Sequence, residues 1–324
     1  MKPRVLVTPR SLTNGPHPAL SRFADAGYDP VLGPAGRQPD RSEIETLLPG
    51  CVGYLAGVEP IDGDTLSRAD QLQIIVRNGV GMDNVDLVAA RKTGIAVYNL
   101  PGINARAVAE LTLGLMFALE RHICASSAAL REARWERTLG RELSGQTLGL
   151  LGFGRIGRHV ASFAAALGMR VQAFDPFIDS SSLAPQQIRF TSFDTVLRTS
   201  DIISLHCPAS DDGRPIIGIE SLRAMPKGSC FINTARWSLM EPEAVLKSLD
   251  SGHLHGCAID AFASEPPDPH EPLLKHPNVL CTPHIGGYTE QCVVRAAESA
   301  VTRMLEALAN LDQTNVTVPA GDHA

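Results

Sequence analysis

The sequence has 324 residues and lacks the features that mark membrane, secreted and nucleic-acid-binding proteins. Its longest apolar stretch, Ala105–Leu119, is too short for a membrane span and contains Glu110. The first residues, MKPRVLVT, lead directly into a short apolar strand, without the hydrophobic region of a signal peptide. No block is strongly basic and the formal net charge is −6, which argues against nucleic acid as a partner. We therefore expect a cytoplasmic protein with no membrane or nucleic-acid partner.

Cysteine pairs at metal-ligand or redox spacing are also missing. The seven cysteines are scattered and form no C-x-x-C pair, so neither a disulfide framework nor a structural zinc site is predicted. His253 and His255 have the spacing of a metal-binding pair, but they lie in a turn flanked by glycine and have no evident third ligand. The sequence therefore predicts no metal site, and the cysteines fit a reducing compartment.

The composition is that of a globular protein, with 44% hydrophobic and 20% charged residues. The length suffices for two domains. Over the first hundred residues, short apolar segments alternate with amphipathic ones. The strands expected there are Val5–Val7, Gly53–Ala56, Gln73–Arg77 and Ile95–Tyr98. Strands that alternate with helices indicate a parallel sheet covered on both faces.

The same alternation restarts after a long helical stretch, predicted from Ala105 to about residue 134. The strands expected in this second block are Thr147–Leu151, Arg170–Phe174, Asp201–His206, Ser229–Asn233 and Gly256–Ile259. An alanine-rich helix is predicted over Tyr288–Ala309. The two blocks together predict an α/β protein with two doubly wound parallel-sheet domains.

The strongest motif is G-x-G-x-x-G in the segment TLGLLGFGRIG, with Gly152, Gly154 and Gly157 as its glycines. It lies between a predicted strand and a predicted helix. The first glycine allows a tight turn, the second lets the backbone approach a pyrophosphate, and the third lets helix and strand pack closely. The free N–H groups at the start of the helix favour phosphate. The motif therefore predicts a dinucleotide-binding site.

An acidic residue, Asp175, ends the next predicted strand, about 20 residues after the last glycine. A carboxylate at this place accepts hydrogen bonds from the adenosine ribose and repels a 2′-phosphate, so NAD is favoured over NADP. A purely structural strand–turn–helix is the alternative. It is disfavoured because the glycine motif and its acidic partner occur together.

Polar residues follow three later strands. Arg236 and Asp260 each come just after one of these strands, and Glu265 lies in the loop after Asp260. His284 follows a further short strand predicted in the segment VLCTPHIGG. In open α/β sheets, ligands bind outside the carboxyl ends of the strands, so we expect these side chains at the edge where the cofactor binds. Taken alone, each residue could be an ordinary loop residue. Their order after a dinucleotide motif favours a catalytic site.

Seven ordered motifs run through the chain: NGVGMDNVDLVAA, LPGINARAVAE, LLGFGRIG, LHCPAS, NTAR, DAFASEPP and TPHIGG. In these motifs the chain resembles the D-isomer-specific 2-hydroxyacid dehydrogenase family, in particular its phosphoglycerate dehydrogenase branch. The resemblance implies a flavodoxin-like substrate domain and a Rossmann NAD domain, with the cleft between them. The substrate domain would comprise residues 1–98 and 288–324, and the NAD domain residues 99–287. The resemblance also implies a homodimer.

The resemblance implies a role for each matching position. Arg236 would hold the substrate carboxylate, His284 would be the acid–base group, and Glu265 would be paired with that histidine. The positions that would line the NAD are Gly152, Gly154, Arg155, Ile156, Gly157, Asp175, His206, Cys207, Pro208, Thr234, Ala235, Asp260 and Gly286. Those that would bind the substrate, besides Arg236, are Ala56, Gly57, Asn78, Gly79 and Val80.

The chemistry of these residue types agrees with the resemblance. Histidine titrates near neutrality, so it can remove the hydroxyl proton of a 2-hydroxy acid and return it in the reverse reaction. A neighbouring carboxylate favours imidazolium and fixes the ring. Arginine offers a planar fork that matches a carboxylate. We therefore expect an NAD-dependent enzyme that interconverts a small D-2-hydroxy acid and its 2-keto acid.

Two segments depart from the family pattern. Trp237 follows Arg236 where the family usually has glycine, and the loop Leu55–Asp62 has no Arg or Lys. Because a phosphate group needs cations, this loop indicates a small unphosphorylated acid. Two other functions stay open, an NAD(H)-sensing binding protein of the same fold and a phosphite dehydrogenase. Formate is disfavoured, since the formate enzymes of the family have glutamine at the position of Glu265.

Overall fold

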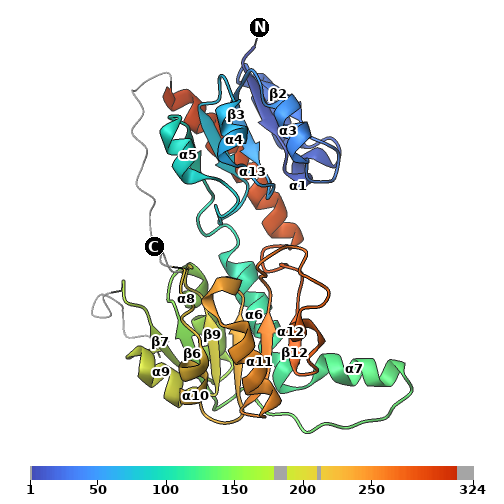
Figure 1. The fold of residues 1–324 in the computed structure, drawn as a ribbon, viewed down its shortest axis with the longest axis vertical. Helices are drawn as coiled ribbons and strands as arrows, with labels where there is room; N and C mark the ends of the chain where they lie inside the picture. The colour runs from blue at the N-terminus through green and yellow to red at the C-terminus, as the bar shows by residue number, and fades with distance from the viewer. Residues whose placement is uncertain (1, 179–187, 210–212, 312–324) are drawn as a thin grey trace. The chain divides into compact units, whose positions relative to one another are not determined.

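The computed structural model describes residues 2–178, 188–209 and 213–311. The chain divides into two compact units (Figure 1). Unit 1 contains the chain up to Asn104 together with the C-terminal segment from Thr289, and unit 2 runs from Ala105 to Tyr288. Residues 312–324, the end of the segment expected in the substrate domain, lie outside the described residues.

Unit 1 is built on a parallel sheet of five strands. They are β1 (Arg4–Val7), β2 (Asp29–Leu32), β3 (Cys51–Ala56), β4 (Ile74–Arg77) and β5 (Ala96–Tyr98). Their order, β2-β1-β3-β4-β5, is that of flavodoxin-like folds. The sequence does not predict β2, because this edge strand is only partly buried and shows no alternation of apolar and polar residues.

Both faces of the first sheet are buried, and β1 shows how. Val5 and Val7 point to the face covered by α13 (Glu290–Leu311), whereas Leu6 points to the opposite face. The other helices of this unit are α1 (Arg10–Thr13), η1 (Pro18–Leu20), α2 (Ser21–Asp25), α3 (Arg41–Leu47), α4 (Gly63–Ser67) and α5 (Leu87–Lys92).

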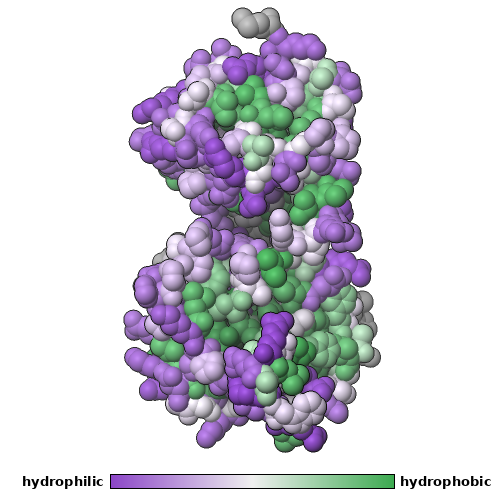
Figure 2. Space-filling model, turned by 90° about the vertical axis from the view of Figure 1, so that its right-hand side faces the viewer, coloured by the Kyte–Doolittle hydropathy of each residue, from purple (hydrophilic) through white to green (hydrophobic). Residues whose placement is uncertain are grey.

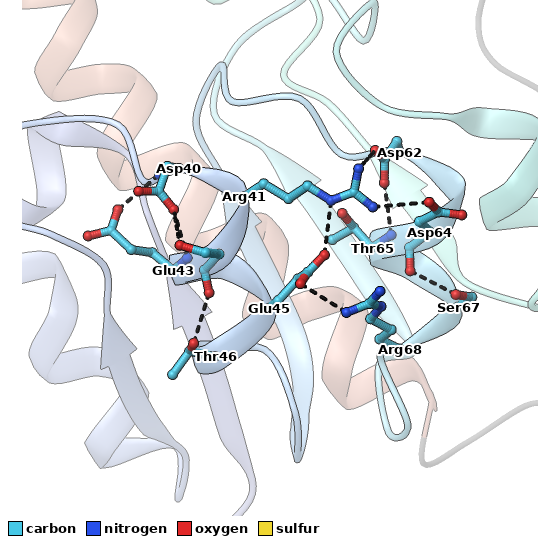
Figure 3. A network of polar contacts seen from close by, with 11 residues as sticks. Asp40, Arg41, Glu43, Glu45, Thr46, Asp62, Asp64, Thr65, Ser67 and Arg68 are labelled. Carbon is cyan, nitrogen blue, oxygen red and sulfur yellow. Dashed lines mark hydrogen bonds and ion pairs between the residues drawn. The ribbon is translucent and has the colours of Figure 1, made fainter.

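A polar network connects α3 and α4 on the surface of unit 1 (Figure 3). Asp40 accepts a hydrogen bond from the Glu43 N–H, and Glu43 accepts one from the Asp40 N–H, so a capping box begins α3. Arg41 reaches Asp62 at 3.0 Å and Asp64 at 3.1 Å. Because these side chains are exposed, the ion pairs contribute little to stability and mainly orient the two helix N-termini.

Unit 2 is built on a parallel sheet of seven strands. They are β6 (Thr147–Leu151), β7 (Arg170–Phe174), β8 (Ile188–Phe190), β9 (Ile202–Leu205), β10 (Ser229–Asn233), β11 (Leu254–Ile259) and β12 (Val279–Cys281). The order is β12-β11-β10-β9-β6-β7-β8. Counted from β6, this is the Rossmann order 3-2-1-4-5-6 with one more strand at the edge. The predicted α/β class with two doubly wound parallel sheets is therefore confirmed.

Helices cover both faces of the second sheet. One core joins it to α6 (Ala105–Glu120) and α8 (Arg155–Ala166). The other core joins it to α9 (Phe193–Thr199), α10 (Ile219–Ala224), η3 (Trp237–Leu239), α11 (Pro242–Asp250) and α12 (Pro272–Lys275). Figure 1 shows α6 and α8 on unit 2 together with the β-strands that they cover.

The predicted continuous helix from Ala105 to about residue 134 is wrong. Helix α6 ends at Glu120, and α7 (Ile123–Arg131) begins after His122, whose φ is +51°. A left-handed residue cannot continue an α-helix, so the chain changes direction there. The sequence gives no sign of the break, since no glycine or proline lies near it.

No helix among the described residues is long and apolar enough to cross a membrane. Figure 2 shows hydrophobic patches between hydrophilic side chains on the face that it draws. Large apolar side chains at the surface include Ile123 and Leu130 on α7, and Trp135 and Leu139 just after it. All seven cysteines are free thiols, and the described residues contain no cluster of three or more metal-binding side chains.

Candidate active site

Strand order in unit 2 reverses between β6 and β9, and the predicted motifs follow these two strands. Gly152 comes after the last residue of β6, Leu151, and His206 comes after the last residue of β9. The His206 N–H donates to the Leu151 carbonyl at 2.8 Å, which ties the two strand ends together. Open α/β sheets bind ligands at such a reversal.

The three glycines of the motif meet different steric demands. Gly152 has a φ of +97°, and a Cβ atom there would lie 2.6 Å from the backbone of His206 and Cys207. A Cβ atom on Gly157 would collide with the Gly152 carbonyl oxygen. By contrast, a Cβ atom on Gly154 would meet nothing within 4 Å. Gly154 is also the N-cap of α8 and makes no side-chain cap, so the first N–H groups of this helix face an open space. A pyrophosphate would fit there.

Two neighbouring residues expected at the cofactor, Arg155 and Ile156, form the first turn of α8. Asp175 follows β7, and its Oδ2 accepts the Phe153 N–H at 2.8 Å while its Oδ1 accepts the Phe177 N–H at 3.0 Å. The carboxylate is thereby fixed beside the glycine motif. Each of its oxygens keeps a further acceptor position, which suits a ribose diol and disfavours a phosphate.

The residues after β9 are uncharged at neutral pH. Burial lowers the pKa of His206 to about 3, and burial raises the pKa of Cys207 to about 11. His206 Nε2 lies 2.9 Å from Ser204 Oγ, whereas its Nδ1 is buried and has no hydrogen-bond partner in the described part of the chain. A bound ligand could satisfy that nitrogen. Pro208, also expected at the cofactor, is exposed just beyond.

The turn after β10 is shaped by Asn233, which is fully buried. Its Oδ1 accepts the Ala235 N–H at 3.1 Å, and its Nδ2 donates to the Arg236 carbonyl at 2.8 Å. Thr234 Oγ1 lies 3.2 Å from Thr112 Oγ1 on α6. Sequence reasoning took Asn233 only as the end of a strand, yet its side chain orients the turn that presents Arg236.

Asp260, at the carboxyl end of β11, holds the loop that carries His284. It is 1% exposed, and its Oδ1 accepts from Thr282 Oγ1 at 2.6 Å and from the Ile285 N–H at 2.9 Å. Its Oδ2 accepts from the Gly286 N–H at 2.8 Å. A Cβ atom on Gly286 would lie 2.9 Å from that oxygen, which explains glycine there. Asp260 therefore acts on the loop as a structural anchor.

His284 and Glu265 form the pair that the sequence predicts. His284 Nδ1 lies 2.7 Å from Glu265 Oε1 and 2.9 Å from Glu265 Oε2. Both side chains are almost half exposed, at 48% and 43%. Because Nδ1 is bonded to the carboxylate, Nε2 is the ring nitrogen that remains for a substrate.

The backbone of His284 is strained, with a φ of +51°. Non-glycine residues rarely adopt this left-handed conformation, and they keep it only where the surrounding structure holds them. Here the His284 N–H donates to the Thr282 carbonyl at 2.9 Å, and Asp260 binds the residues on either side. Such strain at a titratable residue is typical of functional sites.

The positions expected to bind substrate through unit 1 follow β3 and β4. The Asn78 N–H donates to the Ala56 carbonyl at 2.8 Å, and the Gly79 N–H donates to the Arg77 carbonyl at 2.8 Å. A Cβ atom on Gly79 would overlap the Arg77 guanidinium. Val80 follows as a partly buried residue. The amides of Asn78 and Gly79 are thus already engaged within the unit.

Gly57 is held by a buried carboxylate that sequence reasoning missed. Glu59 is 1% exposed, and its Oε1 accepts the Gly57 N–H at 2.9 Å and the Tyr54 hydroxyl at 2.8 Å. Thr8 also donates its hydroxyl to this oxygen. Burial and the charge of Glu59 raise the pKa of Tyr54, which keeps the phenol protonated as a donor. A glutamate in a loop is usually exposed, so the sequence gives no sign of this role.

Comparison with known proteins agrees with the fold and the motifs. Residues 113–286 match the family model described as D-isomer specific 2-hydroxyacid dehydrogenase, NAD binding domain. The chain is 37% identical over 274 residues to a hydroxypyruvate reductase of Thermotoga maritima, and the match covers 83% of this chain and 89% of that protein.

Two further proteins are similar along most of this chain. A D-3-phosphoglycerate dehydrogenase of Bacillus subtilis is 35% identical over 306 residues, or 94% of this chain, but the chain spans only 56% of its length. The crystal structure of the TT0316 protein from Thermus thermophilus superposes with a TM-score of 0.84 at 36% identity, over 95% of this chain and 97% of that one. The chain therefore belongs to the D-isomer-specific 2-hydroxyacid dehydrogenase family and is an NAD-dependent oxidoreductase.

Proposed function

We propose that the protein interconverts a small, unphosphorylated D-2-hydroxy acid and its 2-keto acid, with NAD as the cofactor. The observation that carries this proposal is the His284–Glu265 pair, joined at 2.7 Å on a loop that Asp260 anchors. It lies on the same strand-end edge of unit 2 as the glycine motif. An acid–base group beside a dinucleotide site is the arrangement that hydride transfer to or from a hydroxy acid requires.

The residues of the glycine loop fit the cofactor. Gly154 and the first turn of α8 would hold the pyrophosphate, and Asp175 would bind the adenosine ribose. His206 and Cys207 would line the site, and because both are uncharged at neutral pH they would place no charge beside the cofactor. When bound, the nicotinamide supplies the hydride acceptor or donor.

His284 would move the proton. Glu265 fixes Nδ1, so Nε2 would accept the hydroxyl proton when the acid is oxidised and would donate a proton to the carbonyl oxygen when the keto acid is reduced. The carboxylate would stabilise the imidazolium that forms. Arg236, at the end of the turn that Asn233 shapes, would bind the substrate carboxylate.

The proposal of an unphosphorylated substrate rests on unit 1. The loop Leu55–Asp62 contains no Arg or Lys, and it contains a buried carboxylate, Glu59. A phosphate group would meet no cation from this loop. Because Glu59 takes the Gly57 N–H, we infer that this amide contributes to binding through the shape of the loop rather than as a donor to the substrate.

A panel of keto acids tests the proposed function. Glyoxylate, hydroxypyruvate, pyruvate and phosphohydroxypyruvate are each mixed with NADH and the protein, and the nicotinamide absorbance is followed. We expect turnover of one or more of the first three, and weaker turnover of the phosphorylated compound. Tight NADH binding without any turnover would support an NAD(H)-sensing protein instead, and phosphite-dependent reduction of NAD would support a phosphite dehydrogenase.

The variant His284→Ala tests the assigned acid–base group. We expect kcat to fall about 10²–10⁴-fold, since this is the usual contribution of a positioned proton donor or acceptor. NADH affinity, measured by fluorescence titration, is expected to stay within about threefold of the unmodified protein, because no nucleotide-binding role is assigned to this side chain. Turnover close to that of the unmodified protein would exclude the assignment.

We also propose a homodimer in a reducing, cytoplasmic setting. Ile123 and Leu130 on α7 are 51% and 56% exposed, and Trp135 and Leu139 are 82% and 94% exposed. Neighbouring apolar side chains at such exposure are typical of a surface that another chain covers. We infer a second copy of this chain as the partner, because the resemblance implies a homodimer and most soluble oligomers are symmetric homo-oligomers. The free cysteines suit a reducing compartment.

A further inference from the structure

Trp237 lies directly after Arg236, in the short helix η3, and the backbone of this helix is tightly held. The N–H groups of Ile216 and Ile217 both donate to the Leu239 carbonyl at 3.0 Å. Leu239 itself is 1% exposed. The backbone that carries Trp237 is therefore held against the core of unit 2.

The indole of Trp237 packs against the ring of Phe262. Their ring centroids lie 5.5 Å apart, with an angle of 33° between the ring planes. Both side chains are partly buried against the same hydrophobic core. Aromatic pairs at this spacing stabilise each other by more than the area that they bury.

Phe262 begins the loop that carries Glu265. The residues from Ala263 to Pro266 are exposed, so Phe262 is the last side chain of this segment that packs on the core. The Phe262 N–H donates to Glu265 Oε1 at 3.2 Å. The same oxygen lies 2.7 Å from His284 Nδ1. A chain of contacts thus runs from the Trp237 indole through Phe262 to the carboxylate that holds the imidazole.

We propose that Trp237 is a positioning residue for the proposed reaction, which acts through Phe262 to hold Glu265 against His284. The inference rests on the proposed function. It assigns a use to the large side chain at the position after Arg236, where this chain departs from the glycine usual in the family. Without the indole, Phe262 loses the ring against which it packs, and Glu265 gains freedom in an otherwise exposed loop.

The first test compares Trp237→Gly with Trp237→Phe in keto-acid reduction. For Trp237→Gly we expect kcat to fall about tenfold while the KM for the keto acid changes less than about threefold, because orientation rather than binding is lost. Trp237→Phe keeps an aromatic ring and should restore kcat to within about threefold. An unchanged kcat in Trp237→Gly, or a change confined to KM, would overturn the proposal.

A double-mutant cycle of Trp237 and Phe262 tests whether Trp237 acts on Glu265 through Phe262. Phe262→Ala should reproduce the loss of Trp237→Gly, and the double variant should lose no more than either single variant, since both act through one contact. Losses that multiply would overturn the proposed route. If Trp237→Gly does not fold, Trp237→Leu replaces it, because leucine keeps apolar volume and removes only the ring.

A spectroscopic measurement separates this inference from the proposed function. The Nδ1–H signal of His284, assigned by its absence in His284→Ala, is recorded in ¹H–¹⁵N spectra at one fixed pH without any substrate. In Trp237→Gly this proton should exchange with water faster, because its hydrogen bond to Glu265 is held less well, and in Trp237→Phe the exchange should stay near that of the unmodified protein. This holds even if no keto acid of the panel is turned over. Unchanged exchange of this proton in Trp237→Gly would overturn the inference and leave the proposed function untouched.

Discussion

Asp260 shows how much one buried carboxylate can organise. It accepts one hydroxyl and two backbone N–H groups from the loop around His284, and it is almost fully buried. The family resemblance implies that it lines the cofactor, and its place after a strand puts it at the edge of the sheet where the cofactor is expected. Its contacts indicate a second role, since three of the hydrogen bonds that shape this loop end on its two oxygens.

Replacing Asp260 by asparagine should destabilise the protein. One amide oxygen can still accept, but the amide nitrogen would face the Gly286 N–H, where only an acceptor fits. We expect the free energy of unfolding to fall by about 1–3 kcal/mol, the usual cost of an unsatisfied buried polar group. Urea unfolding measures this change. The matched control is Asp25→Asn on the exposed face of α2, and an equal effect in both variants would contradict the anchoring role.

His206 makes stability depend on pH. Burial lowers its pKa to about 3 in the folded chain, whereas an unfolded histidine has a pKa near 6.5. The unfolded state therefore binds a proton between these values and the folded state does not. The contribution of the neutral ring is complete above about pH 6.5 and is lost progressively as the pH falls toward 3.

The variant His206→Asn tests this dependence. Between pH 7 and pH 5, the unmodified protein should lose about 2 kcal/mol more unfolding free energy than the variant, because asparagine takes up no proton. Urea unfolding at the two pH values gives both numbers. His270→Asn, at an exposed position, should lose as much as the unmodified protein. Equal losses in all three proteins would show that burial of His206 does not control the effect.

At the scale of elements, the connection between β6 and α8 contains two glycines that serve different purposes. A Cβ atom on Gly157 would collide with the Gly152 carbonyl, whereas one on Gly154 would point into open space. The two glycines are three residues apart in one motif, yet Gly157 constrains packing and Gly154 keeps the surface clear. The sequence motif alone does not show which of its glycines is required for packing and which leaves room for a ligand.

Alanine substitutions should separate these two uses of glycine. Gly157→Ala is expected to lower the free energy of unfolding by about 1–3 kcal/mol, since the helix must move away from the strand. Gly154→Ala should leave stability within about 0.5 kcal/mol and weaken NADH binding about tenfold or more, because the methyl group would occupy the place proposed for the phosphates. Thermal unfolding and NADH fluorescence titration measure the two effects. A Gly154→Ala variant that binds NADH normally would place the pyrophosphate elsewhere.

The secondary-structure elements also show where the local sequence is not enough to predict the structure. The alternation of apolar segments predicted most strands of both sheets, because parallel strands are buried on both faces and read as apolar runs. The edge strands β2 and β8 escaped prediction, since they are only partly buried. The break between α6 and α7 escaped as well, because a histidine in the left-handed conformation carries no helix-breaking signal.

At the scale of the whole molecule, the proposed homodimer can be tested through α7 and the segment after it. The double substitution Leu130→Glu and Leu139→Glu places two like charges on exposed apolar positions. We expect light scattering after gel filtration to show a change from dimer to monomer, because a buried unpaired charge costs several kcal/mol at an interface. Circular dichroism should remain unchanged. Val88→Arg on α5 is the control, since it alters an exposed apolar residue of unit 1. A monomer before mutation, or a dimer after it, would refute the proposed surface.

The sequence by itself determined the class of fold, the glycine motif, its acidic partner and the order of Arg236, Glu265 and His284. These follow from local periodicity and from residue types that the chemistry requires. Only the tertiary structure decided that Glu59 is buried against Gly57, that Asp260 anchors the His284 loop, and that Trp237 packs on Phe262. The reason is physical: burial, hydrogen-bond partners and ring contacts depend on which segments distant in sequence come together, and no local pattern encodes that.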